Sequence, residues 1–173
     1  MMRVKQPALA LALIATVGAA SAETERPKPG LQSPVIAAIR SIYQAVEQDI
    51  AAGRTKREQR SVEDCGQLGE QRTIHTDAAG RVRKYVVEGG SEDSALVVRQ
   101  YYDVLGRVRF VFITGGAVNG AVLEHRIYFD ESGARVREDH RYTKGPGYTF
   151  PSVWPEEELA SDPRRSYDQS CSP

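Results

Sequence analysis

The chain has 173 residues, of which 40% are hydrophobic and 27% charged, and its 23 basic and 23 acidic side chains cancel. This length suits a single domain, and the apolar fraction excludes a disordered chain. The sequence has one long apolar stretch, at its extreme N-terminus. A protein that spans a membrane several times is therefore excluded.

The N-terminus has the three parts of a secretory signal peptide. Arg3 and Lys5 are basic, residues 8–17 are apolar, and the small residues at 20–22 form a cleavage site. We therefore predict a signal peptide over residues 1–22 whose removal leaves no membrane span. The expected location is the periplasm in a Gram-negative source and the exterior otherwise. The alternative is an N-terminal anchor that is not cleaved.

Two cysteines, Cys65 and Cys171, remain after this cleavage. An even number of cysteines in an oxidising compartment favours a disulfide, and these two allow only one intramolecular pairing. The bridge would close a loop of roughly 100 residues and contribute up to about 4.7 kcal/mol by the chain-entropy model. We predict that it tethers the C-terminal tail. A redox pair is the alternative, but the sequence has no C-x-x-C motif.

The first regular element is predicted to be an amphipathic helix. Residues 23–32 are polar and contain two prolines, as is typical of a flexible leader. Ser33 and Pro34 then suit the cap and the first position of a helix. The apolar residues that follow at helical spacing are Val35, Ile39, Ile42, Tyr43, Val46 and Ile50. The pattern predicts a helix over residues 34–52 that ends at Gly53 and covers a sheet.

The apolar period changes to two from residue 55, which is typical of β-strands. The strand candidates are 55–62, 70–76, 81–88, 94–102, 107–114, 121–129 and 134–141. The connections at 77–80, 103–106 and 130–133 all read Asp-x-x-Gly, and Arg-Val-Arg closely follows each. This pattern predicts hairpins with a type I turn and a glycine in the left-handed position of a bulge. The repeat period of 26 to 27 residues corresponds to two strands per unit.

These hairpins resemble a known repeat. Residues 101–108, YYDVLGRV, resemble the YD repeat of large bacterial surface and toxin proteins, and residues 127–133, IYFDESG, are a looser match. The layout of an export signal, one helix and YYDxxGxxxF hairpins also resembles small uncharacterised secreted bacterial proteins. The first resemblance implies a structural role, and the second carries no function.

The turns also predict a register that divides the sheet into two faces. With Asp opposite the residue after Gly, Tyr102 faces Val108 on the buried face. The alternate residues then lie on the opposite, exposed face, where Tyr101 pairs with Arg109. The same register pairs His75 with Arg83 and, with a turn longer by one residue, Tyr128 with Arg137. We therefore predict an exposed aromatic–arginine face formed by His75, Arg83, Arg99, Tyr101, Arg109, Arg126, Tyr128 and Arg137.

The tail, residues 142–173, contains five prolines, which exclude a central strand or a long helix. Tyr148, Phe150 and Trp154 are expected to pack the tail along the sheet edge, and residues 156–160 suit one helical turn. The predicted fold class is α+β. Residues 33–141 form one N-terminal helix packed on a curved antiparallel meander of six or seven strands, and residues 142–173 form an irregular, disulfide-tethered tail packed on this domain.

No motif in the sequence identifies an active site, a nucleotide site or a zinc site. His75, His125 and His140 are scattered, and neighbouring acidic residues on a strand point to opposite faces. We therefore predict no catalytic, metal-binding or cofactor-binding residue. Cleavage of the signal peptide leaves a net charge of −2, which does not suggest a nucleic-acid or lipid-surface partner.

The leading hypothesis is an exported, non-enzymatic binding or protein-interaction module that acts through the aromatic–arginine face. Arginine beside an aromatic ring can hold carboxylates, sugars or a protein partner, here an envelope or secreted protein. One alternative is a hydrolase or other enzyme with a site between the sheet and the tail. Another is a structural, YD-repeat-like envelope protein. In the simplest alternative the face is only the wetted side of an antiparallel sheet.

Overall fold

The computed structural model describes residues 29–63, 68–145, 147–151, 154, 159 and 162–170. The predicted signal peptide, residues 156–158 and 160 of the predicted helical turn, and both Cys65 and Cys171 lie outside these residues. The signal peptide and the disulfide therefore stay predictions. In chain order the elements are α1 (Pro34–Ala51), β1 (Lys56–Val62), β2 (Glu70–Thr76), β3 (Val82–Ser91), β4 (Ser94–Tyr102), β5 (Val108–Ala117), β6 (Val122–Phe129), β7 (Arg135–Lys144) and α2 (Pro163–Asp168).

The strands form one antiparallel sheet in which the spatial order is the chain order, β1 to β7. The predicted meander with a helix N-terminal to it is confirmed. All seven predicted strands are present, because their alternating pattern and their turn signals agree with each other. Among the described residues, no helix is long and apolar enough to cross a membrane.

Helix α1 begins and ends at the predicted signals. Ser33 is extended, with φ −62° and ψ 148°, and its hydroxyl accepts a hydrogen bond from the Ile36 backbone N–H. Pro34 occupies the first turn, where it has no hydrogen bond to lose. At the other end Gly53 has φ +67°, the left-handed conformation that terminates helices. The local sequence alone accounts for this element.

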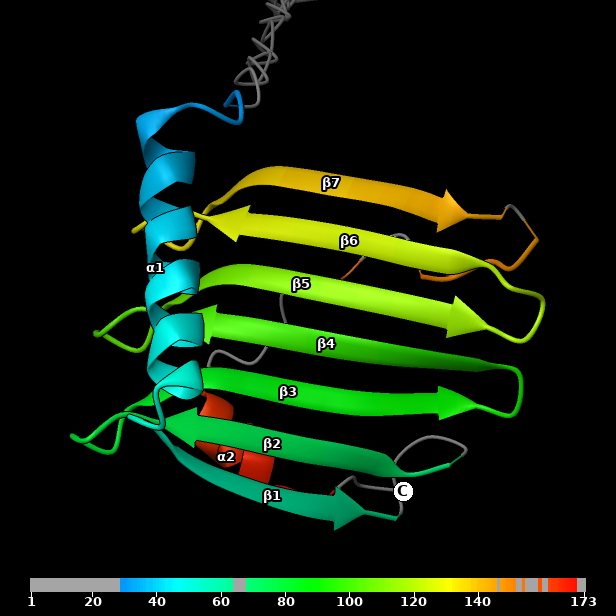
Figure 1. The fold of residues 1–173 in the computed structure, drawn as a ribbon, viewed down its shortest axis with the longest axis horizontal. Helices are drawn as coiled ribbons and strands as arrows, with labels where there is room; N and C mark the ends of the chain where they lie inside the picture. The colour runs from blue at the N-terminus through cyan, green and yellow to red at the C-terminus, as the bar shows by residue number, and fades with distance from the viewer. Residues whose placement is uncertain are drawn as a thin grey trace, which may run out of the picture.

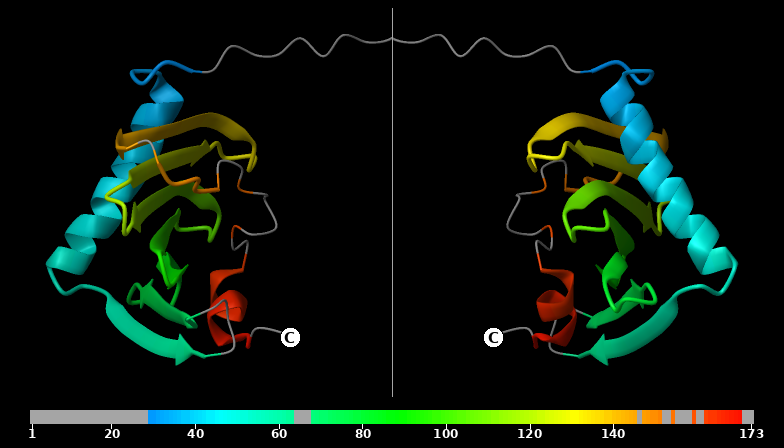
Figure 2. Two further views of the ribbon diagram at one scale, coloured as in Figure 1. Left: turned by 90° about the vertical axis from the view of Figure 1, so that its right-hand side faces the viewer. Right: turned by 90° about the vertical axis from the view of Figure 1, so that its left-hand side faces the viewer.

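The sheet is covered on both faces. Helix α1 crosses the end of the sheet that carries the Asp-x-x-Gly turns, and α2 lies on the opposite side with the tail (Figures 1 and 2). The buried residues of the cluster beneath α1 are Ile36, Ile39, Val46, Tyr101, Phe110 and Tyr128. On the other face the tail residues Phe150, Leu159 and Tyr167 each join a separate buried cluster. The core is therefore split into two layers by the sheet.

The tail differs from its predicted place at the sheet edge. Phe150 packs on the sheet itself, over Gly115 and against Leu123. Tyr148 also joins this cluster, and its hydroxyl donates a hydrogen bond of 2.8 Å to the Ser94 Oγ. The prediction missed that the tail covers a face, because it assumed that the second face of the sheet was wetted. Trp154 likewise packs against the face, beside the cluster that contains Leu159.

Each Asp-x-x-Gly connection folds as predicted. In the second hairpin, Gly106 has φ +78° and the Asp103 backbone N–H donates to the Arg107 carbonyl. The Asp103 carboxylate accepts the backbone N–H groups of Leu105 and Arg107 at 2.9 and 3.0 Å. The aspartates of the other two turns accept the same pair of backbone bonds. The aspartate thus satisfies turn donors that the strand ladder leaves free.

The Arg-Val-Arg segments join neighbouring hairpins. Arg107 pairs with Asp103 at 2.8 Å and donates to the Glu131 carbonyl in the next turn. Arg109 donates to the Phe129 carbonyl at the end of the next strand. In the first hairpin, Arg81 and Arg83 make the equivalent bonds to the carbonyls of Val104 and Tyr102. The arginines of the repeat therefore have a structural role, which is to join each hairpin to the next hairpin of the sheet.

The predicted register is wrong in the first two hairpins. Tyr102 pairs with Val108, but a bulge follows, and Tyr101 pairs with Phe110 instead of Arg109. A bulge in the first hairpin likewise pairs His75 with Lys84 instead of Arg83. Each bulge inserts one residue, which moves every later side chain to the other face of the sheet. The Asp-x-x-Gly pattern predicts the bulge at the turn glycine, but it does not reveal this second bulge in the strand that follows.

The predicted pair of Tyr128 and Arg137 is present, beside the bulge of the third hairpin. The prediction already placed Tyr101 and Tyr128 on the same face, and the bulge of the second hairpin adds Phe110 to that face. That face is the one that α1 covers. The prediction that Tyr101 and Tyr128 lie on an exposed face, away from the helix, is therefore also wrong.

Candidate functional site

The predicted aromatic–arginine face does not exist as one exposed surface. Arg109 is only 3% exposed, and its guanidinium bonds to the Phe129 carbonyl and to Asp103. Arg83 is half-buried and makes the equivalent contacts with Tyr102 and Asp77. These two arginines fill bulges and bind backbone, so they are unavailable to a partner.

Tyr101 anchors α1 to the sheet. It is 1% exposed, and its hydroxyl donates to Glu47 of α1 at 2.7 Å. Burial works to raise the pKa of Glu47, but hydrogen bonds from Lys84 and Tyr101 outweigh it and lower that pKa. Burial, with the Glu47 carboxylate beside it, raises the pKa of Tyr101 well above its ordinary value. A buried, paired tyrosine of this kind is a structural residue.

His75 and Arg137 also have structural surroundings. Burial, with the nearby Lys84 ammonium, lowers the pKa of His75, whose Nδ1 lies 3.4 Å from the Thr55 hydroxyl. Arg137 pairs with Asp139 at 2.7 Å and donates to the Pro29 carbonyl. Of the predicted face, Arg99, Arg126 and Tyr128 remain in one neighbourhood on the helix side of the sheet.

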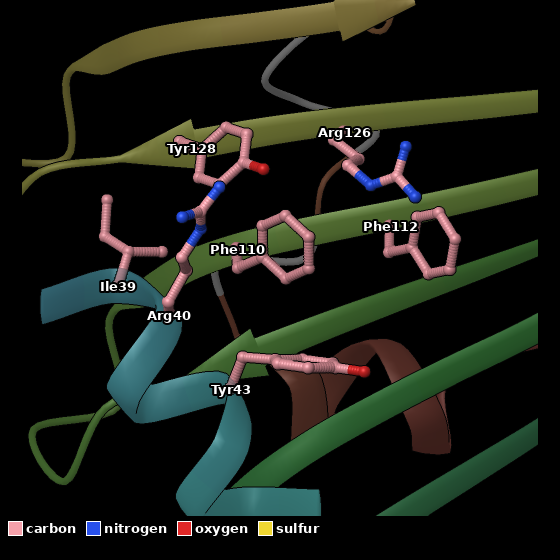
Figure 3. Close-up of a pocket in the computed structure, with 7 residues that line it drawn as sticks. All are labelled: Ile39, Arg40, Tyr43, Phe110, Phe112, Arg126 and Tyr128. Atoms are coloured by element: carbon pink, nitrogen blue, oxygen red, sulfur yellow. The ribbon is translucent and has the colours of Figure 1, made fainter. Parts of the chain in front are cut away.

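That neighbourhood contains a pocket, because α1 covers only one end of the sheet (Figure 1). Its volume is about 280 Å³. We call it the aromatic–arginine pocket, and it is lined by Ile39, Arg40, Tyr43, Phe110, Phe112, Arg126 and Tyr128. Figure 3 shows the three elements that supply these residues: α1, β5 and β6.

The rings of the pocket support one another. The Phe110 ring lies 5.6 Å from Tyr43 in an edge-on arrangement and 5.0 Å from Tyr128. Phe112 stacks at 6.4 Å on the other side of Phe110. Aromatic pairs at these separations favour each other by about 0.5–1.5 kcal/mol beyond the area that they bury. The aromatic wall of the pocket is therefore formed before any ligand arrives.

Two guanidinium groups lie over the Phe112 ring. The Arg126 guanidinium is 4.7 Å from the ring centroid and the Arg99 guanidinium 5.7 Å. Arg126 also pairs with Glu124 at 2.9 Å, and Arg99 donates to the Thr114 hydroxyl. Each interaction restrains a long side chain that would otherwise lose more entropy on binding a ligand.

Several donors of the pocket have no partner in the described part of the chain. Among the described residues, nothing forms a hydrogen bond or ion pair with the Arg40 guanidinium or with the hydroxyls of Tyr43 and Tyr128. The lining contains two arginines and no acidic side chain. Its chemistry is that of an apolar wall with positive charge and spare donors, which suits an anion that also carries an apolar group.

Sequence reasoning missed Arg40, Tyr43, Phe110 and Phe112. Arg40 lies on the polar face of the predicted helix. The predicted register, in which Val108 is on the buried face, places Phe110 and Phe112 on that face as well. The signal that was available is the alternation over residues 108–112, which places two phenylalanines on the same face. Only the bulge decides that this face is the one beneath α1.

The described residues offer no metal centre, since no group of three or more histidine, cysteine or acidic side chains among them could hold an ion. His125 is fully buried, and its Nε2 lies 2.6 Å from Glu138. Burial lowers the pKa of His125 although Glu138 favours its charged form. Among the described residues, its Nδ1 has no hydrogen-bond partner.

Comparison with protein-family models, with curated proteins and with solved structures finds no match to this chain.

Proposed function

We propose that the protein is an exported, non-enzymatic binding module and that its ligand contacts the aromatic–arginine pocket. One observation carries the proposal: a preformed aromatic wall and two guanidinium groups line a pocket that has no acidic side chain. Binding sites typically combine a mostly apolar lining with a few polar groups that orient the ligand. Export rests on the signal peptide predicted over residues 1–22.

The charge of the pocket specifies an anion. Arg40 has no acidic partner among the described residues, and Arg126 shares one terminal nitrogen with Glu124 and keeps its other donors. A carboxylate can accept two parallel bonds from one guanidinium, which is among the stronger polar contacts in proteins. An apolar group on the same ligand would replace water against Phe110 and Phe112.

The edge strands of the sheet give little support to the alternative of a structural, YD-repeat-like envelope protein. The edge strands are β1 and β7. Their sequences, KREQRSV and RVREDHRYTK, are dominated by charged residues. Charged edges oppose pairing with further strands. Among the described residues, the buried pair of His125 and Glu138 lies on the tail side of the sheet, but apolar clusters also occupy this contact, so the enzyme alternative has less support than binding.

A titration followed by NMR tests the proposal. Phenylacetate, which combines a ring with a carboxylate, is added to the labelled protein, and benzylamine and acetate serve as probes that lack the anion or the ring. We expect saturable shifts of the amide resonances of Phe110, Phe112 and Arg126 with phenylacetate alone.

The double variant Arg40→Gln with Arg126→Gln should weaken this binding by about tenfold or more, because it removes charge-assisted hydrogen bonds. The matched control changes the exposed Arg54 and Arg165, which do not line the pocket, to Gln. The control should bind phenylacetate as the unmodified protein does. Equal binding of benzylamine, or shifts confined to other parts of the chain, would contradict the proposal.

A further inference from the structure

The pocket and the sheet beside it together point to a narrower class of ligand. Resting on the function proposed above, we infer that the site captures the C-terminal residue of a polypeptide partner, with a large apolar side chain against Phe110 and Phe112 and the terminal carboxylate on Arg40 and Arg126. The remainder of the partner would lie on the part of the sheet that α1 leaves uncovered.

The size of the pocket is the first argument. Its volume of about 280 Å³ lies just below the roughly 300–1,000 Å³ that small-molecule sites occupy. That space suits one large side chain with its terminal carboxylate. A longer ligand must therefore continue outside the pocket.

The distribution of charge is the second argument. A terminal residue brings a carboxylate within a few bonds of its side chain, and the pocket places guanidinium donors beside an aromatic wall over a similarly short span. The Arg126 guanidinium lies 4.7 Å from the Phe112 ring, so one ligand residue can reach both groups. The Tyr43 and Tyr128 hydroxyls supply further donors without a partner among the described residues.

The surface next to the pocket is the third argument. From Phe112 it continues to Arg99, whose guanidinium bonds to Thr114, and Thr114 pairs across the ladder with Val97. All four side chains are half-buried and share the helix side of the sheet. We call Arg99, Thr114 and Val97 the open strip. The open strip offers an extended peptide a cation, a hydroxyl and an apolar contact in succession. A small acid such as phenylacetate would not reach it.

Calorimetric titrations with four probes test this inference on the purified protein. Two acetylated tetrapeptides share the sequence Gly-Ala-Ala-Phe and end in a free carboxylate or in an amide, and a third ends in Ala with a free carboxylate. Phenylacetate is the fourth probe. We expect the free-acid Phe peptide to bind about tenfold more tightly than each of the other three, because only this peptide fills the pocket, presents the anion and reaches the open strip.

Two variants separate the pocket from the strip. Arg40→Gln with Arg126→Gln should remove the preference for the free acid over the amide. Val97→Ala should weaken the free-acid Phe peptide several-fold and leave phenylacetate unchanged, since Val97 belongs to the open strip and does not line the pocket. Thermal unfolding of each variant shows whether the fold is retained, and Arg54→Gln with Arg165→Gln is the control for lost charge.

The outcomes distinguish this inference from the proposed function. If phenylacetate binds as tightly as the free-acid peptide, the ligand is a small acid; the inference is then overturned and the proposed function stands. If the amide binds as tightly as the acid, recognition of a terminal carboxylate is overturned. If neither phenylacetate nor any peptide binds, both fail.

Discussion

At the scale of single residues, two adjacent glycines in β5 have opposite surroundings. A Cβ on Gly115 would lie 2.8 Å from Phe150 Cε1 and 3.0 Å from Leu96 Cδ2. A Cβ on Gly116 would have no atom within 4 Å. Because neighbouring residues of a strand point to opposite faces, Gly115 accommodates the tail and Gly116 points to the helix side.

Gly115→Ala should therefore destabilise the protein by about 1–3 kcal/mol, the usual cost of overpacking a well-filled core. Gly116→Ala is the matched control and should be neutral or stabilising by up to about 1 kcal/mol, since alanine is favoured over glycine in a strand. Urea denaturation of the two variants measures the difference. Equal stability of the pair would mean that Phe150 does not lie against Gly115.

The arginine side chains of this chain have two kinds of surroundings. Arg109 is buried, with its donors committed to Phe129 and Asp103. Arg40 is exposed and has no partner among the described residues. An Arg109 variant therefore probes stability, and an Arg40 variant probes the proposed binding.

At the scale of elements, the Asp-x-x-Gly hairpin is the unit that repeats. Its aspartate accepts two backbone hydrogen bonds within the turn, and its arginines bond to carbonyls of the next hairpin. The third hairpin has no further hairpin to bond to. There Arg135 donates instead to the Trp154 carbonyl of the tail. The third hairpin thus departs from the repeat because the sheet ends at β7.

The turn aspartates should make the free energy of unfolding depend on pH in the acidic range. Burial works to raise the pKa of Asp103, but hydrogen bonds from Arg107 and Leu105 outweigh it, so the folded pKa lies below the ordinary 3.8. As the pH falls through about 4, the unfolded chain takes up this proton before the folded protein does. The contribution of Asp103 is therefore complete above about pH 5 and is lost as the pH falls toward its folded pKa.

Asp103→Asn should cost about 1–3 kcal/mol at pH 7, because charge-assisted bonds to Arg107 and Arg109 are lost, and less at pH 3. Urea denaturation at both pH values measures this change. Glu131→Gln removes the same charge from an exposed position in the next turn and should change stability by less than about 0.5 kcal/mol. If Asp103→Asn costs the same free energy at both pH values, the ionised form of Asp103 is not what stabilises the turn.

At the scale of the whole molecule, the sheet is the middle layer of three. Helix α1 covers one end of one face, and the tail and α2 lie against the other (Figure 2). The tail reaches apolar clusters along the second face through Phe150, Leu159 and Tyr167. Because α1 leaves part of its own face uncovered, the candidate site lies on that face.

If the tail belongs to the core, its variants should destabilise the whole protein. Phe150→Ala and Leu159→Ala should each cost about 2–5 kcal/mol, as large-to-small changes in a core do. Thermal unfolding followed by near-ultraviolet circular dichroism, which reports the aromatic residues beneath α1, should show a single transition at a lower temperature than in the unmodified protein. Val118→Ala, at a position that is 81% exposed, is the control and should have little effect. A transition unchanged by the tail variants would mean that the tail is not part of the cooperative unit.

Most of the fold was predictable because its signals are local. Ser33 and Pro34 start α1, Gly53 ends it, and each Asp-x-x-Gly pattern specifies a turn within four residues. Helix α2 has a similar start, in which Asp162 caps the helix before Pro163. The prediction did not use that signal.

The sequence by itself determined the helix, the seven strands, their antiparallel order and the hairpin turns, because short-range hydrogen bonds and side-chain periodicity decide these features. Only the tertiary structure decided which face each residue occupies. A single inserted residue, such as Arg109, reverses the alternation of a strand, and its stabilising partners Phe129 and Asp103 lie outside that strand. The pocket depends on the same long-range choice, because it forms where α1 meets Phe110 and Tyr128 of the sheet.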